Sequence, residues 1–177
     1  MPTQEPSRFL QVTDSNALEL ACRLLGSARH ASLGVLQPGS GMPALSRVAL
    51  GHDALGLPLI LISGLSAHCV ALQQDPRCGL LVGEPGAGDP LAHPRLSLEC
   101  LAERTDDSER SLLRDIFVAW QPKARLYVDF ADFSFWRLRP QAASLNGGFG
   151  KAWRLEGQDL QALLQRLGKH PPPSAGQ

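Results

Sequence analysis

The sequence lacks the features that identify many common protein classes. Lysine plus arginine and aspartate plus glutamate balance at 17 each, so no overall field attracts nucleic acid or an anionic membrane surface. No apolar run approaches the roughly 20 residues that span a bilayer, and the first residues show no basic segment followed by an apolar one. We therefore expect a cytoplasmic protein with no nucleic-acid or membrane partner.

Cysteine is also sparse, and its spacing excludes a disulfide or zinc framework. The four cysteines occur singly inside apolar segments, without CxxC spacing, at Cys22, Cys69, Cys78 and Cys100. Secreted disulfide scaffolds are much denser in cysteine, and zinc ligands usually come in close pairs separated by turn residues. This pattern predicts reduced thiols in the core.

The common catalytic signatures are missing as well. The chain contains no GxGxxG, no Walker phosphate loop, no GxSxG elbow and no HExxH. No general acid or nucleophile can be assigned from spacing, so the catalytic residues are unknown at this stage.

The segments that are present predict one α+β domain that is mainly β. Its length of 177 residues suits a single core. Helical spacing predicts an N-terminal helix at about residues 14–29 and a C-terminal helix at about 157–167. Between them, at about 31–155, hairpin-linked strands with inserted helices indicate an antiparallel barrel. We read 133–140 and 142–148 as two strands of a hairpin, and 171–177 as a flexible tail beyond the domain at 1–170.

The most suggestive local feature is the segment from Ser63 to His68. An apolar strand, PLILIS, ends at Ser63, and Ser66 can cap the helix that follows. A strand end that meets a helix N-terminus presents hydroxyls, backbone N–H groups and a positive helix end, which suits a phosphate. The alternative is that both serines serve as turn and cap residues.

A resemblance favours the binding site over the turn. The order PALSRV, LPLILISGLSAHCVALQQDPRCGLLV, HPRLSLE, ARLYVDFADFSFWRLRP and GGFGKAWRL resembles the pyridoxamine 5′-phosphate oxidase-like split-barrel superfamily, and within it the haem-utilisation branch. The match covers roughly residues 28–167 in the right order. Its most specific parts are the S-x-L-x-x-H helix start, the DF ahead of a strand and the GGFG turn.

The resemblance implies a six-stranded antiparallel split barrel with flanking helices, a homodimer, and FMN in the groove between subunits, in an oxidoreductase-related protein. The residues that it assigns to FMN are Ser46, Arg47, Val48, Ser63, Ser66, His68 and Cys69. Flavin-binding relatives commonly place arginine or lysine at the phosphate, where this chain has Gly64, His68 and Cys69. Arg47 or Arg77 would then have to supply the charge.

The haem-utilisation branch implies an alternative cofactor. Members of that branch bind haem at the dimer interface through a histidine in the C-terminal tail, supported by an acidic residue before the late strand. His170 and Asp132 occupy those positions here. A carboxylate bound to an imidazole fixes its tautomer and raises its basicity as an iron ligand. One competing interpretation is a tail histidine without a role and an Asp132 that simply hydrogen-bonds a turn. The other is a barrel that has lost its cofactor and serves as a binding module.

Overall fold

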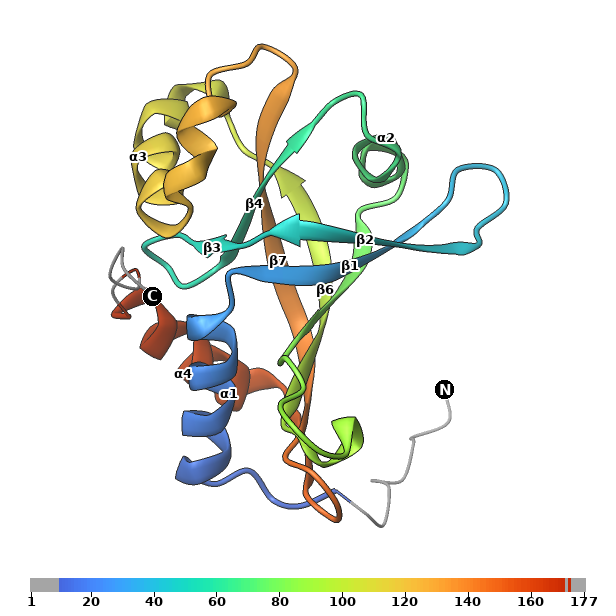
Figure 1. Ribbon diagram of the computed structural model, residues 1–177, viewed down its shortest axis with the longest axis vertical. Coiled ribbons are helices and arrows are strands. Elements are labelled where there is room, and N and C mark those ends of the chain that lie inside the picture. The colour runs from blue at the N-terminus through green and yellow to red at the C-terminus, as the bar shows by residue number, and fades with distance from the viewer. Residues whose placement is uncertain (1–9, 171, 173–177) are drawn as a thin grey trace.

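The structure is a computed structural model that describes residues 10–170 and residue 172. In this part of the chain, one antiparallel sheet of eight strands is accompanied by four α-helices (Figure 1). The strands are β1 (His30–Leu36), β2 (Pro43–Ala49), β3 (Gly51–His52), β4 (Pro58–Ser63), β5 (Arg77–Val82), β6 (Arg95–Arg104), β7 (Phe133–Asn146) and β8 (Ala152–Leu155). The α-helices are α1 (Ser15–Ser27), α2 (Ala67–Gln74), α3 (Arg110–Trp120) and α4 (Gly157–Gly168).

The sheet is curved, and its two edge strands, β2 and β3, follow one another directly in the sequence. Its strand order is β2-β1-β5-β6-β7-β4-β3, with β8 paired to β7. Leu50 alone separates β2 from β3, although these strands lie at opposite ends of that order. This half-barrel is consistent with the predicted split barrel, but it has eight strands instead of six. The difference arises because β3 continues β2 past Leu50, and because β8 pairs only with the end of β7.

The sequence of β4, PLILIS, is largely apolar because both faces of this strand are buried. Ile60 and Ile62 belong to the larger core, which fills the inside of the sheet. Leu59 and Leu61 belong to a second core, in which α3 packs on the other side. A strand that is covered on both faces shows an unbroken apolar run instead of an alternating one.

The prediction of two hairpin strands at 133–140 and 142–148 is wrong. One continuous strand, β7, runs through both and pairs with β6 along its length. The register shifts between Glu99 and Cys100, where Cys100 lies opposite Pro140 and Glu99 lies opposite Ala142. The extra residue, Gln141, makes a β-bulge, which is where a strand tolerates a proline that cannot donate a backbone hydrogen bond.

Three of the α-helices lie at two ends of the sheet, and α2 packs against β1. Helices α1 and α4 lie side by side at one end, and α3 lies near the opposite end (Figure 1). Asp14 caps α1 by accepting a 2.8 Å hydrogen bond from the Ala17 N–H. The turn before β4 packs on α4 at Gly56. This residue has a φ of 78°, which favours glycine, and a Cβ added to it would lie 2.1 Å from the Leu164 carbonyl oxygen.

In the described part of the chain, no helix is long and apolar enough to cross a membrane. The predicted flexible tail at 171–177 lies outside the described residues, apart from residue 172.

Candidate functional site

The corner between β4 and α2 is held by the two serines that the sequence singled out. The Ser66 hydroxyl donates a 2.7 Å hydrogen bond to the Ser63 carbonyl and accepts one of 3.3 Å from the Cys69 N–H, so it caps α2. The Ser63 hydroxyl accepts a 3.1 Å hydrogen bond from the Leu65 N–H. These bonds fix the turn and account for the two serines at its ends.

A second segment closes on this corner from the start of β7. The Ser63 hydroxyl donates to Oδ2 of Asp132 at 2.5 Å, and the Gly64 N–H donates to the Asp132 carbonyl at 2.6 Å. A Cβ at Gly64 would lie 3.3 Å from that carbonyl oxygen, so the absence of a side chain allows the close approach. The structure therefore places the carboxylate of Asp132 at the hydroxyl of Ser63.

Beside the corner lies a cavity of about 310 Å³ with largely apolar walls. Strands β2 and β4, the start of α2 and the segment before β7 contribute its lining. The lining residues are Arg47, Val48, Ala49, Leu61, Ile62, Ser63, Ser66, His68, Tyr127 and Phe133. Among the described residues that line this cavity, Arg47 is the only arginine or lysine, and it is exposed.

His68 lies between this cavity and a neighbouring one. The neighbouring cavity, of about 320 Å³, is also lined by Ser46, Ala67 and Val70. Burial lowers the pKa of His68 below its ordinary value, which leaves the imidazole neutral near pH 7. A neutral imidazole can ligate a metal, but it contributes no positive charge to an anion.

The structure brings together five of the seven residues that the resemblance assigned to FMN. Arg47, Val48, Ser63, Ser66 and His68 line the first cavity, and Ser46 lines its neighbour. The seventh, Cys69, has a side chain that is 1% exposed and packs in the core. Its backbone N–H is at the corner, and burial raises the pKa of its thiol.

Two aromatic residues that line the cavity, and an arginine that holds their segment in place, were not predicted from the sequence. Tyr127 and Phe133 line the cavity with ring centroids 5.2 Å apart. Arg110, on α3, donates hydrogen bonds to the carbonyls of Val128 and Phe133 at 2.8 Å and of Phe130 at 3.3 Å. No spacing signal links α3 to this segment, because the contacts come from tertiary packing.

The structure places His170 away from Asp132 within the chain. The His170 ring packs over Gly26, with Cδ2 3.4 Å from the position of a Cβ there, and it influences the buried His52 electrostatically. His52 pairs with Pro58 at the start of β4, whereas Ser63 and Asp132 lie at its end. Five residue steps along a strand span roughly 17 Å. Within the described residues, no group of three His, Cys, Asp or Glu side chains could hold a metal ion.

No family model matches the chain. The non-canonical heme oxygenase HOZ of Arabidopsis thaliana chloroplasts is 32% identical over 124 residues, which is 69% of this chain and 37% of that protein. The structure of a heme-binding protein from Mycobacterium smegmatis is 32% identical, with a TM-score of 0.76 over 85% of this chain and 62% of that chain. This chain thus spans less than two thirds of either relative.

A more distant structure shows the fold alone. A protein of the pyridoxinephosphate oxidase family from Clostridium acetobutylicum is 15% identical, with a TM-score of 0.65 over 84% of this chain and 99% of that chain. The motif order of the sequence, the curved antiparallel sheet and these similarities agree. The chain belongs to the pyridoxamine 5′-phosphate oxidase-like split-barrel superfamily, in its haem-utilisation branch.

Proposed function

We propose that this protein binds haem and serves in haem utilisation, with the tetrapyrrole in the cavity that Ser63, His68, Tyr127 and Phe133 line. The observation that carries the proposal is the 2.5 Å hydrogen bond from Ser63 to Asp132. The corner that suited an FMN phosphate by sequence already holds a carboxylate. A phosphate next to it would meet like charge, so the corner disfavours FMN.

The remaining donors at the corner also fit FMN poorly. The Ser66 hydroxyl is engaged in capping α2, and His68 is neutral near pH 7. Arg77, which the sequence offered as a compensating cation, is bound to Asp75 through hydrogen bonds of 2.6–3.1 Å and does not line the cavity. Arg47 remains, and one exposed arginine provides a modest share of the charge that a phosphate site needs.

The cavity suits a flat apolar ring system with a polar edge. Val48, Leu61 and Ile62 provide aliphatic surface, and Tyr127 and Phe133 provide aromatic surface. Arg47 at the rim can pair with a propionate carboxylate. The volume of about 310 Å³ from one chain lies at the small end for a cofactor site, so a second subunit would complete the enclosure.

The relatives support haem over FMN. The Arabidopsis relative is named a heme oxygenase and the mycobacterial one a heme-binding protein, and both are 32% identical to this chain. Haem binding is the property common to these names. We propose oxidative breakdown of the bound haem as the activity that would follow binding. When bound, haem would supply the redox chemistry, and the chain's own residues would hold and enclose it.

We propose His170 as the iron ligand and Asp132 as its carboxylate partner. Because the two residues lie at opposite ends of β4 in one chain, the pairing requires Asp132 of one subunit and His170 of another. A homodimer is therefore part of the proposal. In that arrangement the Asp132 carboxylate, already held by Ser63, would fix the orientation of the imidazole.

Titration of the purified protein with hemin tests the proposal. We expect a saturable Soret band at one haem per subunit, a dimer by light scattering, and a shifted Soret band with weaker binding in His170→Ala. His93→Ala is the matched control, because it removes an imidazole that lines neither cavity while leaving the proposed ligand. A spectrum that is unchanged in His170→Ala would remove that residue as ligand. A protein that takes up neither hemin nor flavin would instead be a cofactor-free binding module.

A further inference from the structure

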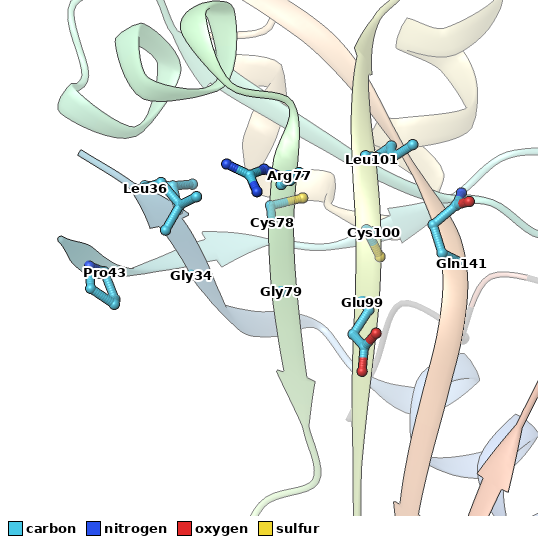
Figure 2. Close-up of a pocket in the computed structure, with 11 residues that line it drawn as sticks. Gly34, Leu36, Pro43, Arg77, Cys78, Gly79, Glu99, Cys100, Leu101 and Gln141 are labelled. Carbon is cyan, nitrogen blue, oxygen red and sulfur yellow. The ribbon is translucent and has the colours of Figure 1, made fainter. Parts of the chain in front are cut away.

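Cys78 and Cys100 lie directly opposite each other on the antiparallel strands β5 and β6. The same register pairs Leu80 with Leu98 and Val82 with Leu96, so the two cysteines end a ladder of facing apolar residues. Both thiols are free. In Figure 2 the sulfur of Cys78 points toward the strand that carries Cys100.

The geometry of this position matches that of a disulfide. Directly opposed residues on antiparallel strands have Cα atoms about 4.5–5.5 Å apart. Disulfides span Cα distances of about 4.4–6.8 Å. A bond between the two sulfurs therefore needs no separation or approach of the strands. Cys22 and Cys69 lie on helices α1 and α2, so neither has a cysteine facing it across a strand pair.

A groove lies beside this pair, and the partial exposure of Cys78 gives reagents access to its thiol. The groove measures about 540 Å³ and is lined by Cys78 and Cys100 together with Gly34, Gly79, Glu99 and Leu101, among others (Figure 2). Gly34 and Gly79 are neighbours across β1 and β5, and their missing side chains leave this part of the sheet uncovered. Cys78 is half-buried, whereas Cys100 is 3% exposed. The two thiols thus differ in access.

We propose that Cys78 and Cys100 form a reversible dithiol–disulfide site that low-molecular-weight disulfides oxidise. The more accessible Cys78 attacks one sulfur of the small disulfide as a thiolate, and one small thiol leaves. Cys100 then gives up its proton and displaces the second small thiol from Cys78. The protein dithiol loses two hydrogens in total, and the small disulfide is reduced to two thiols.

The difference in access assigns an order to the two cysteines. The neighbouring Cys78 thiol and burial raise the pKa of Cys100, which keeps it protonated until Cys78 has reacted. Cys100 is then the resolving thiol. This inference is independent of haem binding, because the groove shares no lining residue with the cavity beside Ser63 among the described residues.

Oxidised glutathione, applied to the full-length protein, tests the proposal. We expect the free thiols to fall from four to two, with peptide mapping placing the new bond between Cys78 and Cys100. Dithiothreitol should restore all four thiols. Because the bond closes a loop between two strands, the oxidised protein should melt roughly 5–10 °C higher than the reduced protein. Four remaining thiols, or a bond that joins two chains, would overturn the proposal.

Single variants test the assigned order. Cys100→Ala should trap a stable mixed disulfide with glutathione on Cys78, because no resolving thiol remains. Cys78→Ala should leave Cys100 unmodified. Cys69→Ala, which removes a buried thiol outside the pair, is the matched control and should form the disulfide as the wild type does. Equal modification of Cys100 in Cys78→Ala would contradict the order, and an unmodified Cys78 in Cys100→Ala would contradict the site.

Discussion

Ser63 and Asp132 are separated by 69 residues in the sequence and joined by a hydrogen bond of 2.5 Å between Oγ and Oδ2. The bond links the end of β4 to the segment that precedes β7, next to the point where Ser63 pairs with Phe133 in the sheet. It changes the chemistry of the corner. A serine that is free to donate would help to bind a phosphate, whereas this serine donates to a carboxylate and brings a negative charge with it.

Selectivity between FMN and riboflavin reports on this carboxylate. We expect the wild-type protein to bind FMN no more tightly than riboflavin, because Asp132 opposes the phosphate. Asp132→Asn keeps a hydrogen-bond acceptor for Ser63 and removes the charge, so it should improve FMN binding relative to riboflavin by about 5- to 10-fold. Flavin fluorescence quenching measures both affinities.

Asp129→Asn is the matched control for this comparison. Its carboxylate is engaged by Arg114 at 2.8 Å, outside the cavity, so its removal should leave the ratio of the two affinities unchanged. Strong preference of the wild type for FMN would contradict the proposed effect of Asp132.

The candidate site was predictable in part from the sequence. The strand end and helix cap at Ser63 and Ser66 follow from local turn chemistry, which spacing reveals. The bond to Asp132 and the aromatic wall at Tyr127 depend on packing between distant segments, for which a single sequence carries no signal. The pairing of Asp132 with His170 came from the family resemblance, and the single chain places the two residues apart.

Arg110 positions the segment that carries Asp132. Its guanidinium donates to three backbone carbonyls between Val128 and Phe133. Arg110→Met keeps much of the aliphatic volume and leaves those carbonyls without their donor. We expect a loss of about 2–3 kcal/mol in unfolding free energy, measured with urea, together with weaker hemin binding.

Arg114→Met on the same helix is the control, because Arg114 forms an exposed ion pair with Asp129 that is worth at most about 1 kcal/mol. A similar loss in both variants would show that the carbonyl contacts of Arg110 contribute no more than a surface pair.

The fold was more predictable than the site, and its main error has a local cause. Alternating residues in β6, Leu96, Leu98, Cys100 and Ala102, are all buried, which is the period of two typical of a strand with one buried face. The predicted break falls at Pro140, and a proline cannot donate a ladder bond. The bulge at Gln141 removes that conflict, and a bulge depends on the partner strand, which the segment's own sequence does not reveal.

Arg137 joins three elements through two ion pairs. It donates to Asp53 at 2.8 Å and to Glu109 at 2.7 Å, and Asp53 is 6% exposed. Arg137→Met should cost about 3 kcal/mol of unfolding free energy, because it leaves the Asp53 charge buried without its partner. The double variant Asp53→Asn with Arg137→Met should recover part of that loss, since it removes the isolated charge. Arg139→Met, which breaks an exposed pair with Glu103, should change stability by less than about 1 kcal/mol.

His52 makes the stability of the protein depend on pH. Its side chain is 1% exposed, contacts Trp120 edge-on at 4.9 Å between ring centroids, and has no hydrogen-bond partner among the described residues. Burial, with a smaller contribution from His170, lowers its pKa from 6.5 to about 4. Between these values the unfolded chain binds a proton that the folded chain does not.

Stability should therefore be fully present above pH 6.5 and fall as the pH drops toward 4, by about 3 kcal/mol from this residue. Urea unfolding at several pH values measures the slope. His52→Leu removes the imidazole, so its stability should depend less on pH between 6.5 and 4 than that of the wild type. Carboxylates that titrate in this range affect both proteins alike. His170→Ala should retain most of the slope, because burial is the larger cause. Equal slopes of stability against pH in the wild type and His52→Leu would contradict this prediction. They would mean that His52 binds a proton as readily in the folded protein as in the unfolded chain, which its apolar surroundings oppose.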